Sequence, residues 1–348
     1  MLCYTLVNMK NILFVSTAKQ IGGGEKFLGN ILQNISTNYL DYKPFIVCNK
    51  EVESFFKSIL SKNQIISFSF RDVSQNVLHN NYTFVISNDF KSTIIIPLYW
   101  KTKKIQIIHT EKYLDKKWYF WIKMILFIIV KQFINTHVCV SENVYKSWGI
   151  KSATIIENGI NNKSKNYLFD IKKIPKIGYV GNYSSSKGQN EFLDILISNK
   201  IKNEVHFFGN GYNNLYFKEK IKGNKINAIF HGFVDSREKI YRSFDILALC
   251  SHSEGYPLAP REAILYGKLI ITYDVGDLKN IITNGKNGFI LPIGNKKYYG
   301  EKLIKMLNNP LKILEMQKKS LKNVGLIKSI DEMTGDYIEI LEGLIKNG

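Results

Sequence analysis

Two glutamates separated by seven residues are the part of the sequence whose residue types most clearly suggest chemistry. Glu254 and Glu262 lie in the segment SHSEGYPLAPREAILYGKLIIT, which spans residues 251–272. A strand-like apolar run precedes Glu254, and Pro260 suits the first turn of a helix, in which Glu262 would then fall. Free N–H groups at such a helix start attract phosphate, and Gly255 lets a ligand approach the backbone closely. The pattern predicts two carboxylates that bind hydroxyl groups beside a phosphate.

Each glutamate alone also has a simpler explanation. A carboxylate in the first turn of a helix stabilises it through the helix dipole by roughly 0.3–1 kcal/mol, which would account for Glu262 without a ligand. Glu254 alone could be a solvated loop residue. The complete string of residues around the two glutamates favours a binding site over both alternatives.

Two glycine-containing turns follow apolar, strand-like runs and could present backbone N–H groups to an anion. They are IGGGEKF, with Gly22, Gly23 and Gly24, and GYVGNYSSSKGQ, with Gly181, Asn182 and Lys187. The simpler alternatives are a tight turn for the first and a surface lysine in a turn for the second. Neither has the G-x-G-x-x-G spacing of a dinucleotide fingerprint, so each supports a phosphate site only together with the glutamates.

The string around the glutamates closely resembles the hallmark of the retaining glycosyltransferase family 4, whose members have the two-domain GT-B fold. The matching residues are Ser251, Glu254, Gly255, Tyr256, Leu258, Glu262, Ala263 and Gly267. The usual proline after the glycine is absent. The resemblance implies that Glu254 lies near the donor sugar and its reacting carbon and that Glu262 binds the ribose. It also implies that backbone amides around Pro257, Leu258 and Ala259 hold sugar and phosphate groups.

The second glycine turn resembles the family's G-R…K-G element, whose arginine and lysine hold the donor diphosphate. Gly181, Lys187 and Gly188 match this element, and Asn182 stands in place of the arginine. A hydrogen bond from a charged group is worth about 1.5–3 kcal/mol, and asparagine supplies only a neutral one. Arg261 is a candidate for compensating this loss.

Further matches to the family fall at the ends of other strand-like runs. Gly22–Gly24 resemble its G-G-x-E element, which faces the cleft from the N-terminal domain. His109 stands where a family histidine contacts the donor sugar, although a lone histidine at a strand end is also often structural. We expect Ser141 to cap a helix and the segment 158–160 to shape the connection into a polar linker. His231 also matches a family position and is expected to be structural.

Apolar β-branched runs alternate with helical stretches twice along the chain, which predicts parallel sheets covered on both faces. The expected fold is α/β of the GT-B class, with two Rossmann-like domains whose parallel sheets face a central cleft. We expect an N-terminal acceptor-binding domain over residues 1–165 and a C-terminal nucleotide-sugar-binding domain over 166–330. A C-terminal helix over 331–348 is expected to pack back on the N-terminal domain. Ligands of such folds bind at the carboxyl ends of the strands.

The composition favours an anionic ligand in a reducing compartment. The 348 residues carry 48 basic against 29 acidic side chains, a net charge of +19, which attracts anions or reflects lysines on solvated faces. Nucleic-acid motifs are absent from the sequence, so we expect no nucleic-acid partner. The widely spaced cysteines are expected to be free thiols; they are Cys3, Cys48, Cys139 and Cys250. Without a D-x-D motif, we expect no metal and no cofactor, only a nucleoside diphosphate sugar as co-substrate.

The stretch 118–134, WYFWIKMILFIIVKQFI, is strongly apolar but too short to span a bilayer. Lys123 and Lys131 interrupt it, whereas a spanning helix needs about 20 apolar residues. It predicts a helix that is either buried or lies on a membrane surface. The basic neighbours Lys112, Lys116 and Lys117 favour an anionic surface. We therefore expect a cytoplasmic protein with a peripheral membrane contact through residues 112–134 as an open alternative to a buried helix.

The predicted activity is that of a retaining glycosyltransferase. It would move a hexose-like group from a nucleoside diphosphate sugar, with UDP among the candidate nucleotides, to a hydroxyl of a sugar or lipid-linked saccharide. The expected setting is bacterial surface polysaccharide or glycolipid assembly. Two alternatives stay open: a degenerate member that binds an anionic polymer or membrane, and a GT-B nucleotide-sugar epimerase. The epimerase would need further acid–base residues that we do not find in the sequence.

Overall fold

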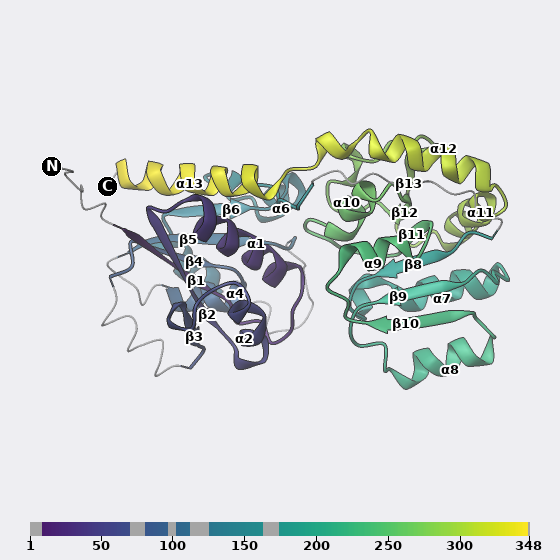
Figure 1. Ribbon diagram of the computed structural model, residues 1–348, viewed down its shortest axis with the longest axis horizontal. Coiled ribbons are helices and arrows are strands. Elements are labelled where there is room, and N and C mark those ends of the chain that lie inside the picture. The colour runs from purple at the N-terminus through teal and green to yellow at the C-terminus, as the bar shows by residue number, and fades with distance from the viewer. Residues whose placement is uncertain (1–8, 70–80, 97–101, 112–124, 163–173, 347–348) are drawn as a thin grey trace. The chain divides into compact units, whose positions relative to one another are not determined.

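The computed structural model describes residues 9–69, 81–96, 102–111, 125–162 and 174–346 (Figure 1). The chain divides into two compact units, of which the first combines residues 1–161 with 328–348 and the second spans 162–327. Each unit contains its own parallel sheet and its own helices. The division lies close to the expected boundary at residue 165, and the C-terminal segment belongs to the first unit.

The first unit is built around a seven-stranded parallel sheet in the order β3-β2-β1-β4-β5-β6-β7. Its strands are β1 (Lys10–Val15), β2 (Tyr42–Cys48), β3 (Ile65–Ser67), β4 (Phe84–Ser87), β5 (Lys103–Ile108), β6 (Thr136–Cys139) and β7 (Thr154–Ile155). Ile12 to Val15 are fully buried in the central strand β1, as expected where helices cover both faces of a parallel sheet. The apolar runs predicted all of these strands except the short edge strands β3 and β7.

Helices of the first unit follow the strands and cover the sheet. They are α1 (Gly23–Asn38), α2 (Lys50–Lys57), α4 (Phe90–Ile95), α6 (Glu142–Trp148) and α13 (Ile330–Lys346). Ser141 caps α6 by accepting a hydrogen bond from the Val144 amide, which confirms that expectation. Helix α13 lies beside α1 (Figure 1), where the rings of Tyr337 and Phe27 are 5.9 Å apart.

The segment 158–160 joins the first unit to the chain that returns before α13. The Ile160 amide donates to the Lys328 carbonyl at 3.0 Å. A Cβ on Gly159 would lie 2.2 Å from the Ser329 carbonyl oxygen, so only glycine allows this close backbone approach. The linker that the sequence predicts next, residues 163–173, lies outside the described residues.

The second unit is built around a six-stranded parallel sheet in the order β10-β9-β8-β11-β12-β13. Its strands are β8 (Ile177–Val180), β9 (Val205–Phe208), β10 (Ala228–Gly232), β11 (Ile246–Leu249), β12 (Leu269–Tyr273) and β13 (Gly288–Leu291). Its helices are α7 (Gln189–Ser198), α8 (Leu215–Gly223), α9 (Arg237–Arg242), α10 (Leu258–Leu265), α11 (Lys296–Leu307) and α12 (Pro310–Leu321). The strand order reverses between β8 and β11, which makes the carboxyl end of this pair the place where ligands of such sheets bind.

The apolar stretch is helical over residues 125–130 and continues as the 3₁₀ turn η3 (Lys131–Phe133). Within residues 125–133, Phe127 and Val130 are buried, whereas the other large apolar side chains are exposed: Ile125, Leu126, Ile128, Ile129 and Phe133. None of the helices in the described ranges is long and apolar enough to cross a membrane. Lys112, Lys116 and Lys117 lie outside the described residues.

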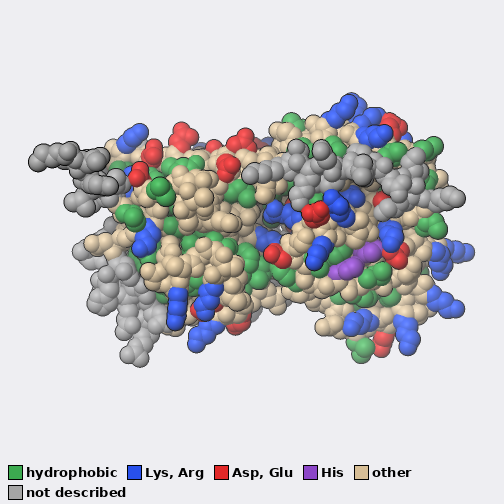
Figure 2. Space-filling model, viewed as in Figure 1, with side chains coloured by type: hydrophobic (Ala, Val, Ile, Leu, Met, Phe, Trp, Pro, Cys, Tyr) green, Lys and Arg blue, Asp and Glu red, His purple; other side chains and the backbone are tan. Residues whose placement is uncertain are grey.

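On the face drawn in Figure 2, the described basic side chains do not form a single patch. Figure 2 shows Lys and Arg spread over both units on the face it presents, with acidic side chains between them. Cys48, Cys139 and Cys250 are buried free thiols, and Cys3 lies outside the described residues.

Candidate functional site

The strands β8 and β11 are hydrogen-bonded neighbours whose carboxyl ends carry the two most suggestive sequence motifs. The chain leaving β8 forms a loop and the 3₁₀ turn η4 (Ser185–Lys187) before α7 begins. The chain leaving β11 forms the loop 250–257 before α10 begins. Lys187 and Glu254 are therefore brought to the same edge of the sheet, at its topological switch point.

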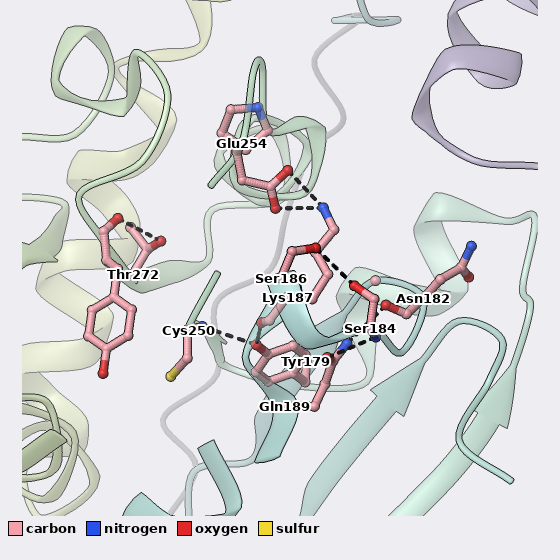
Figure 3. Close-up of polar contacts among 12 residues, drawn as sticks. Tyr179, Asn182, Ser184, Ser186, Lys187, Gln189, Cys250, Glu254 and Thr272 are labelled. Atoms are coloured by element: carbon pink, nitrogen blue, oxygen red, sulfur yellow. Dashed lines mark hydrogen bonds and ion pairs between the residues drawn. The ribbon is translucent and has the colours of Figure 1, made fainter. Parts of the chain in front are cut away.

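Lys187 and Glu254 form an ion pair in which the ammonium contacts both carboxylate oxygens (Figure 3). Lys187 Nζ donates to Glu254 Oε1 at 2.6 Å and to Oε2 at 2.7 Å. The two side chains are 34% and 15% exposed, respectively, so the pair is sheltered but reachable from solvent. An ammonium group that is partly accessible at the carboxyl edge of a parallel sheet can bind a phosphate, and a carboxylate beside it can bind a sugar hydroxyl.

Gly188 allows the two loops to approach each other. Its φ is +73°, a region that favours glycine, and a Cβ at this position would lie 2.0 Å from the Cys250 carbonyl oxygen. The His252 amide donates to the Ser186 carbonyl at 2.8 Å across the same contact. In the K-G pair of the sequence motif, Lys187 therefore lies in the site, and Gly188 is the residue whose missing Cβ allows the two loops to pack together.

Replacing Gly188 with alanine is expected to destabilise the second unit by about 2 kcal/mol or more, because the left-handed conformation and the backbone clash both oppose a Cβ. Gly294→Ala is the matched control: its φ is +78° and its Cβ would meet nothing within 4 Å. Urea unfolding of both variants measures the difference. Equal losses in the two variants would contradict the close contact between Gly188 and Cys250.

Glu262 does not lie where the sequence pattern predicted. Helix α10 begins at Leu258, so Glu262 is its fifth residue and falls in the second turn, not the first. The residue is 5% exposed, and its carboxylate accepts from Arg237 Nε at 2.7 Å and from the Tyr241 hydroxyl at 2.8 Å. The prediction failed because the helix begins two residues before Pro260, at Leu258, so that Pro260 is its third residue.

The remaining residues of the motif take different positions along the loop. Gly255, Tyr256 and Pro257 are buried, whereas Leu258 and Ala259 at the start of α10 are partly accessible. Helix α10 has no side-chain cap, which leaves the early amides of Leu258 and Ala259 as candidate donors to an anion. Pro257 has no N–H group and cannot contribute one.

Arg261 does not compensate for the missing arginine. It is 1% exposed, its guanidinium lies 3.5 Å from the Tyr256 ring centre, and its Nη1 donates to the Pro257 carbonyl at 3.0 Å. These contacts hold Arg261 and Tyr256 inside the loop. Both residues therefore shape the loop backbone from within.

Asn182 lies on the loop after β8 and serves its structure. Its Oδ1 accepts from the Asn210 amide at 2.8 Å, and its backbone carbonyl accepts from Gln189 Nε2 at 3.0 Å. In Figure 3 its side chain points away from the Lys187–Glu254 pair. Gly181, directly before it, has a φ of +154° and donates its amide to the Phe208 carbonyl.

The other predicted site residues gather at the corresponding edge of the first unit. Gly22 caps α1, and Glu25 closes the turn by accepting from the Gly22 amide at 3.0 Å. A Cβ on Gly24 would lie 3.2 Å from Asn88 Nδ2. Asn88 Oδ1 is 2.7 Å from His109 Nε2. The first glycine turn and His109 are thus linked through Asn88.

His109 is half-buried, and its environment keeps it uncharged near neutral pH. Burial lowers the pKa of His109 to about 4, with the carboxylate of Asp89 acting in the opposite direction. The ring also makes an edge-on contact with Phe27 at 5.0 Å. A neutral imidazole can donate or accept a hydrogen bond with a sugar, but it does not supply positive charge.

Arg237 and Asn88 are candidate site residues that the sequence reasoning missed. Arg237 lies at the start of α9 and pairs with Glu262, and Asn88 follows β4 and contacts His109. A usable signal existed for Asn88, since it comes directly after a predicted strand in FVISN. Within the described ranges, no group of three His, Cys, Asp or Glu residues is arranged to hold a metal ion.

Comparison with known proteins identifies the second unit. Residues 162–324 match the family model described as "Glycosyl transferases group 1". The second unit is a glycosyltransferase group 1 domain. The matched range covers nearly all of residues 162–327, including Lys187, Glu254 and Glu262. The chain is therefore an enzyme of the glycosyltransferase class.

Curated relatives resemble the chain to different extents. An "Uncharacterized 41.2 kDa protein in cps region" of Klebsiella pneumoniae is 22% identical over 316 residues, which are 80% of this chain and 85% of that protein. The poly(glycerol-phosphate) alpha-glucosyltransferase of Bacillus subtilis is 25% identical over 109 residues, but these are only 30% of this chain and 16% of that enzyme.

The fold as a whole is shared with solved structures. HepE of Anabaena, solved in complex with UDP-glucose, has a TM-score of 0.82 at 15% identity, and the match covers 96% of this chain and 99% of that chain. At this identity the likeness concerns the fold alone. It confirms the predicted class, α/β with two Rossmann-like domains built on parallel sheets.

Proposed function

We propose that this glycosyltransferase transfers a sugar from a nucleoside diphosphate sugar to a hydroxyl acceptor with retention of anomeric configuration. The observation that carries the proposal is the Lys187–Glu254 pair at the switch point of a glycosyltransferase group 1 domain. A cation for the diphosphate and a carboxylate for the sugar are adjacent there, as a donor of this kind requires.

The proposed donor diphosphate binds Lys187 and the amides at the start of α10. As the bond between the sugar and the diphosphate breaks, negative charge grows on the leaving group and the sugar becomes oxocarbenium-like. An ammonium fixed in place before the reaction stabilises this charge without reorganisation. We propose that Lys187, and not a metal ion, neutralises the leaving diphosphate.

Glu254 is proposed to face the transferred sugar. When the diphosphate takes hydrogen bonds from Lys187, the Glu254 carboxylate is released to orient the sugar hydroxyls and to support the positive character of the ring. We propose Glu262 for the ribose, held in position by Arg237 and Tyr241. Retention then follows from attack on the same face as the leaving diphosphate.

UDP is the nucleotide that we propose to test first. The HepE structures contain UDP or UDP-glucose, and a TarM structure of S. aureus contains UDP with a glycosylated glycerol. The proposed acceptor is a saccharide or polyol of a bacterial surface polymer, which the cps-region relative and the poly(glycerol-phosphate) enzyme support. We propose that the first unit, with Gly22–Gly24 and His109, contributes to acceptor and donor-sugar binding.

The experiment is a thermal-shift and calorimetric panel of UDP, GDP, ADP and their common sugars with the full chain. Glu262→Ala is run beside the wild type, and Glu315→Ala, an exposed carboxylate on α12, is the control. We expect one nucleotide to bind the wild type and the control equally and the Glu262 variant more weakly. A folded protein that binds none of them would favour the alternative of a member that binds anionic polymers.

We further propose a peripheral membrane contact through the exposed apolar side chains between residues 125 and 133, which include Ile128 and Ile129. Ile128→Asn/Ile129→Asn is expected to lower partition onto phosphatidylglycerol vesicles by about 30-fold, because each of the two half-exposed isoleucines contributes on the order of 1 kcal/mol when buried. The matched control replaces Leu215 and Tyr216, an adjacent exposed pair on α8. If both variants and the wild type bind the vesicles equally, the proposed membrane contact is wrong.

A further inference from the structure

One buried hydroxyl group connects the two loops that carry Lys187 and Glu254. Tyr179 lies in β8, and its hydroxyl donates to the backbone carbonyl of Lys187. The same oxygen accepts from the Cys250 amide at 3.1 Å. Figure 3 shows the Tyr179 ring between the two loops, below the ion pair.

The bridge is anchored on both sides by tight packing. Tyr179 is fully buried, and its ring lies 5.0 Å from the ring of Phe192 in α7 and 5.9 Å from that of Phe207 in β9. Its position is therefore fixed by the core and not by the loops. Removing this hydroxyl would leave one buried carbonyl and one buried amide without a hydrogen-bond partner, which lowers stability.

The hydroxyl keeps its proton under ordinary conditions. Burial raises the pKa of Tyr179 well above its usual range. The group therefore stays neutral and donates to the Lys187 carbonyl while accepting from the Cys250 amide. The carbonyl can only accept and the amide can only donate, so a neutral hydroxyl satisfies both partners at once.

We propose that Tyr179 is a positioning residue that sets the distance between the diphosphate-binding Lys187 and the sugar-facing Glu254. The inference rests on the proposed function of this pair. Tyr179 acts on the backbone of Lys187 itself and on Cys250, four positions before Glu254 in the chain. Its loss lets the loops separate while both charged side chains remain present.

The test uses Tyr179→Phe, which keeps the ring in the core and removes only the bridging oxygen. Tyr183→Phe is the matched control, because its hydroxyl is on the same loop but, among the residues that the structure describes, bonds with the exposed Asn190 alone. Amide exchange at Cys250, measured without nucleotide, is expected to become at least about fivefold faster in Tyr179→Phe, since one hydrogen bond of about 1 kcal/mol is lost. It should not change in the control.

The second readout is UDP calorimetry in a cycle of wild type, Glu254→Gln, Tyr179→Phe and the double variant. We expect Glu254→Gln to change UDP affinity at least threefold in the wild-type background and less than twofold in the Tyr179→Phe background. If Tyr179 were only structural, its loss would lower stability, but Glu254→Gln would change UDP affinity equally in both backgrounds. That result would overturn the proposal. Unchanged amide exchange at Cys250 in Tyr179→Phe would overturn it as well. Failure of the wild type to bind any nucleotide would instead overturn the proposed function.

Discussion

Replacing Glu254 with glutamine is expected to abolish most sugar transfer while making UDP bind more tightly. In the free protein the Glu254 carboxylate occupies two hydrogen bonds of the Lys187 ammonium, and a diphosphate must compete for them. Glutamine weakens this competition, because its neutral amide oxygen is a poorer acceptor than a carboxylate, and it removes a negative charge next to the incoming phosphates. Since partly exposed ion pairs are worth up to about 1 kcal/mol, UDP affinity should rise by about three- to fivefold.

The transfer rate should fall in the same variant by about 10²-fold or more, because the carboxylate that supports the oxocarbenium-like sugar is lost. UDP release from UDP-glucose measures the rate, and calorimetry measures the affinity. Glu204→Gln is the matched control: Glu204 pairs with Lys176 at 2.6 Å at the amino end of β9, on the opposite edge of the same sheet. Weaker UDP binding by a folded Glu254→Gln variant would contradict the proposed exchange.

Replacing Lys187 with methionine is expected to lower the transfer rate by about 10²- to 10³-fold and UDP affinity by about tenfold. The ammonium stabilises the charge that develops on the leaving diphosphate, so its removal affects the transition state more than the bound nucleotide. Methionine keeps an unbranched side chain, one atom shorter, and removes the positive charge together with its hydrogen-bond donors. Removing the partner of Glu254 also affects stability. Urea unfolding measures that change in the free energy of unfolding independently of the transfer rate.

Lys176→Met serves as the control for Lys187→Met, because Lys176 also forms a lysine–glutamate pair in the second unit but lies at the opposite edge of the sheet. It should retain full transfer and full UDP affinity. A Lys187→Met variant whose kcat and UDP affinity both stay within twofold of the wild type would remove the lysine from the proposed mechanism.

The sequence was sufficient to predict the parallel sheets, and the family resemblance assigned Lys187 and Glu254 to one donor site without predicting their ion pair. Buried parallel strands are nearly continuous apolar runs, and the family motifs lie directly after two of them. Because parallel strands end at one edge of the sheet, motifs after β8 and β11 had to meet once these strands paired. The edge strands β3 and β7 are too short for such a pattern, and Thr154 and Ile155 are exposed.

The partners of the site residues could not be predicted, because they come from tertiary packing. The Arg237–Glu262 pair joins α9 to α10 across 25 positions of the chain, and the Tyr179 hydroxyl reaches Cys250 across 71. The spacing of Tyr179 in the sequence predicts only a buried position in a strand and does not indicate that its hydroxyl bonds two loops. Whether Glu262 falls in the first or the second turn of α10 depends on the residue at which the helix starts. A proline is tolerated at several positions of the first turn, so Pro260 does not identify that residue.

The most direct test of the account is a calorimetric titration of the full chain with UDP, wild type beside Lys187→Met and Lys176→Met. We expect UDP to bind the wild type and Lys176→Met alike, at one site per chain, and to bind Lys187→Met about tenfold more weakly. Equal binding by all three folded proteins, or no binding by the wild type, would contradict a nucleotide-sugar site built on the Lys187–Glu254 pair.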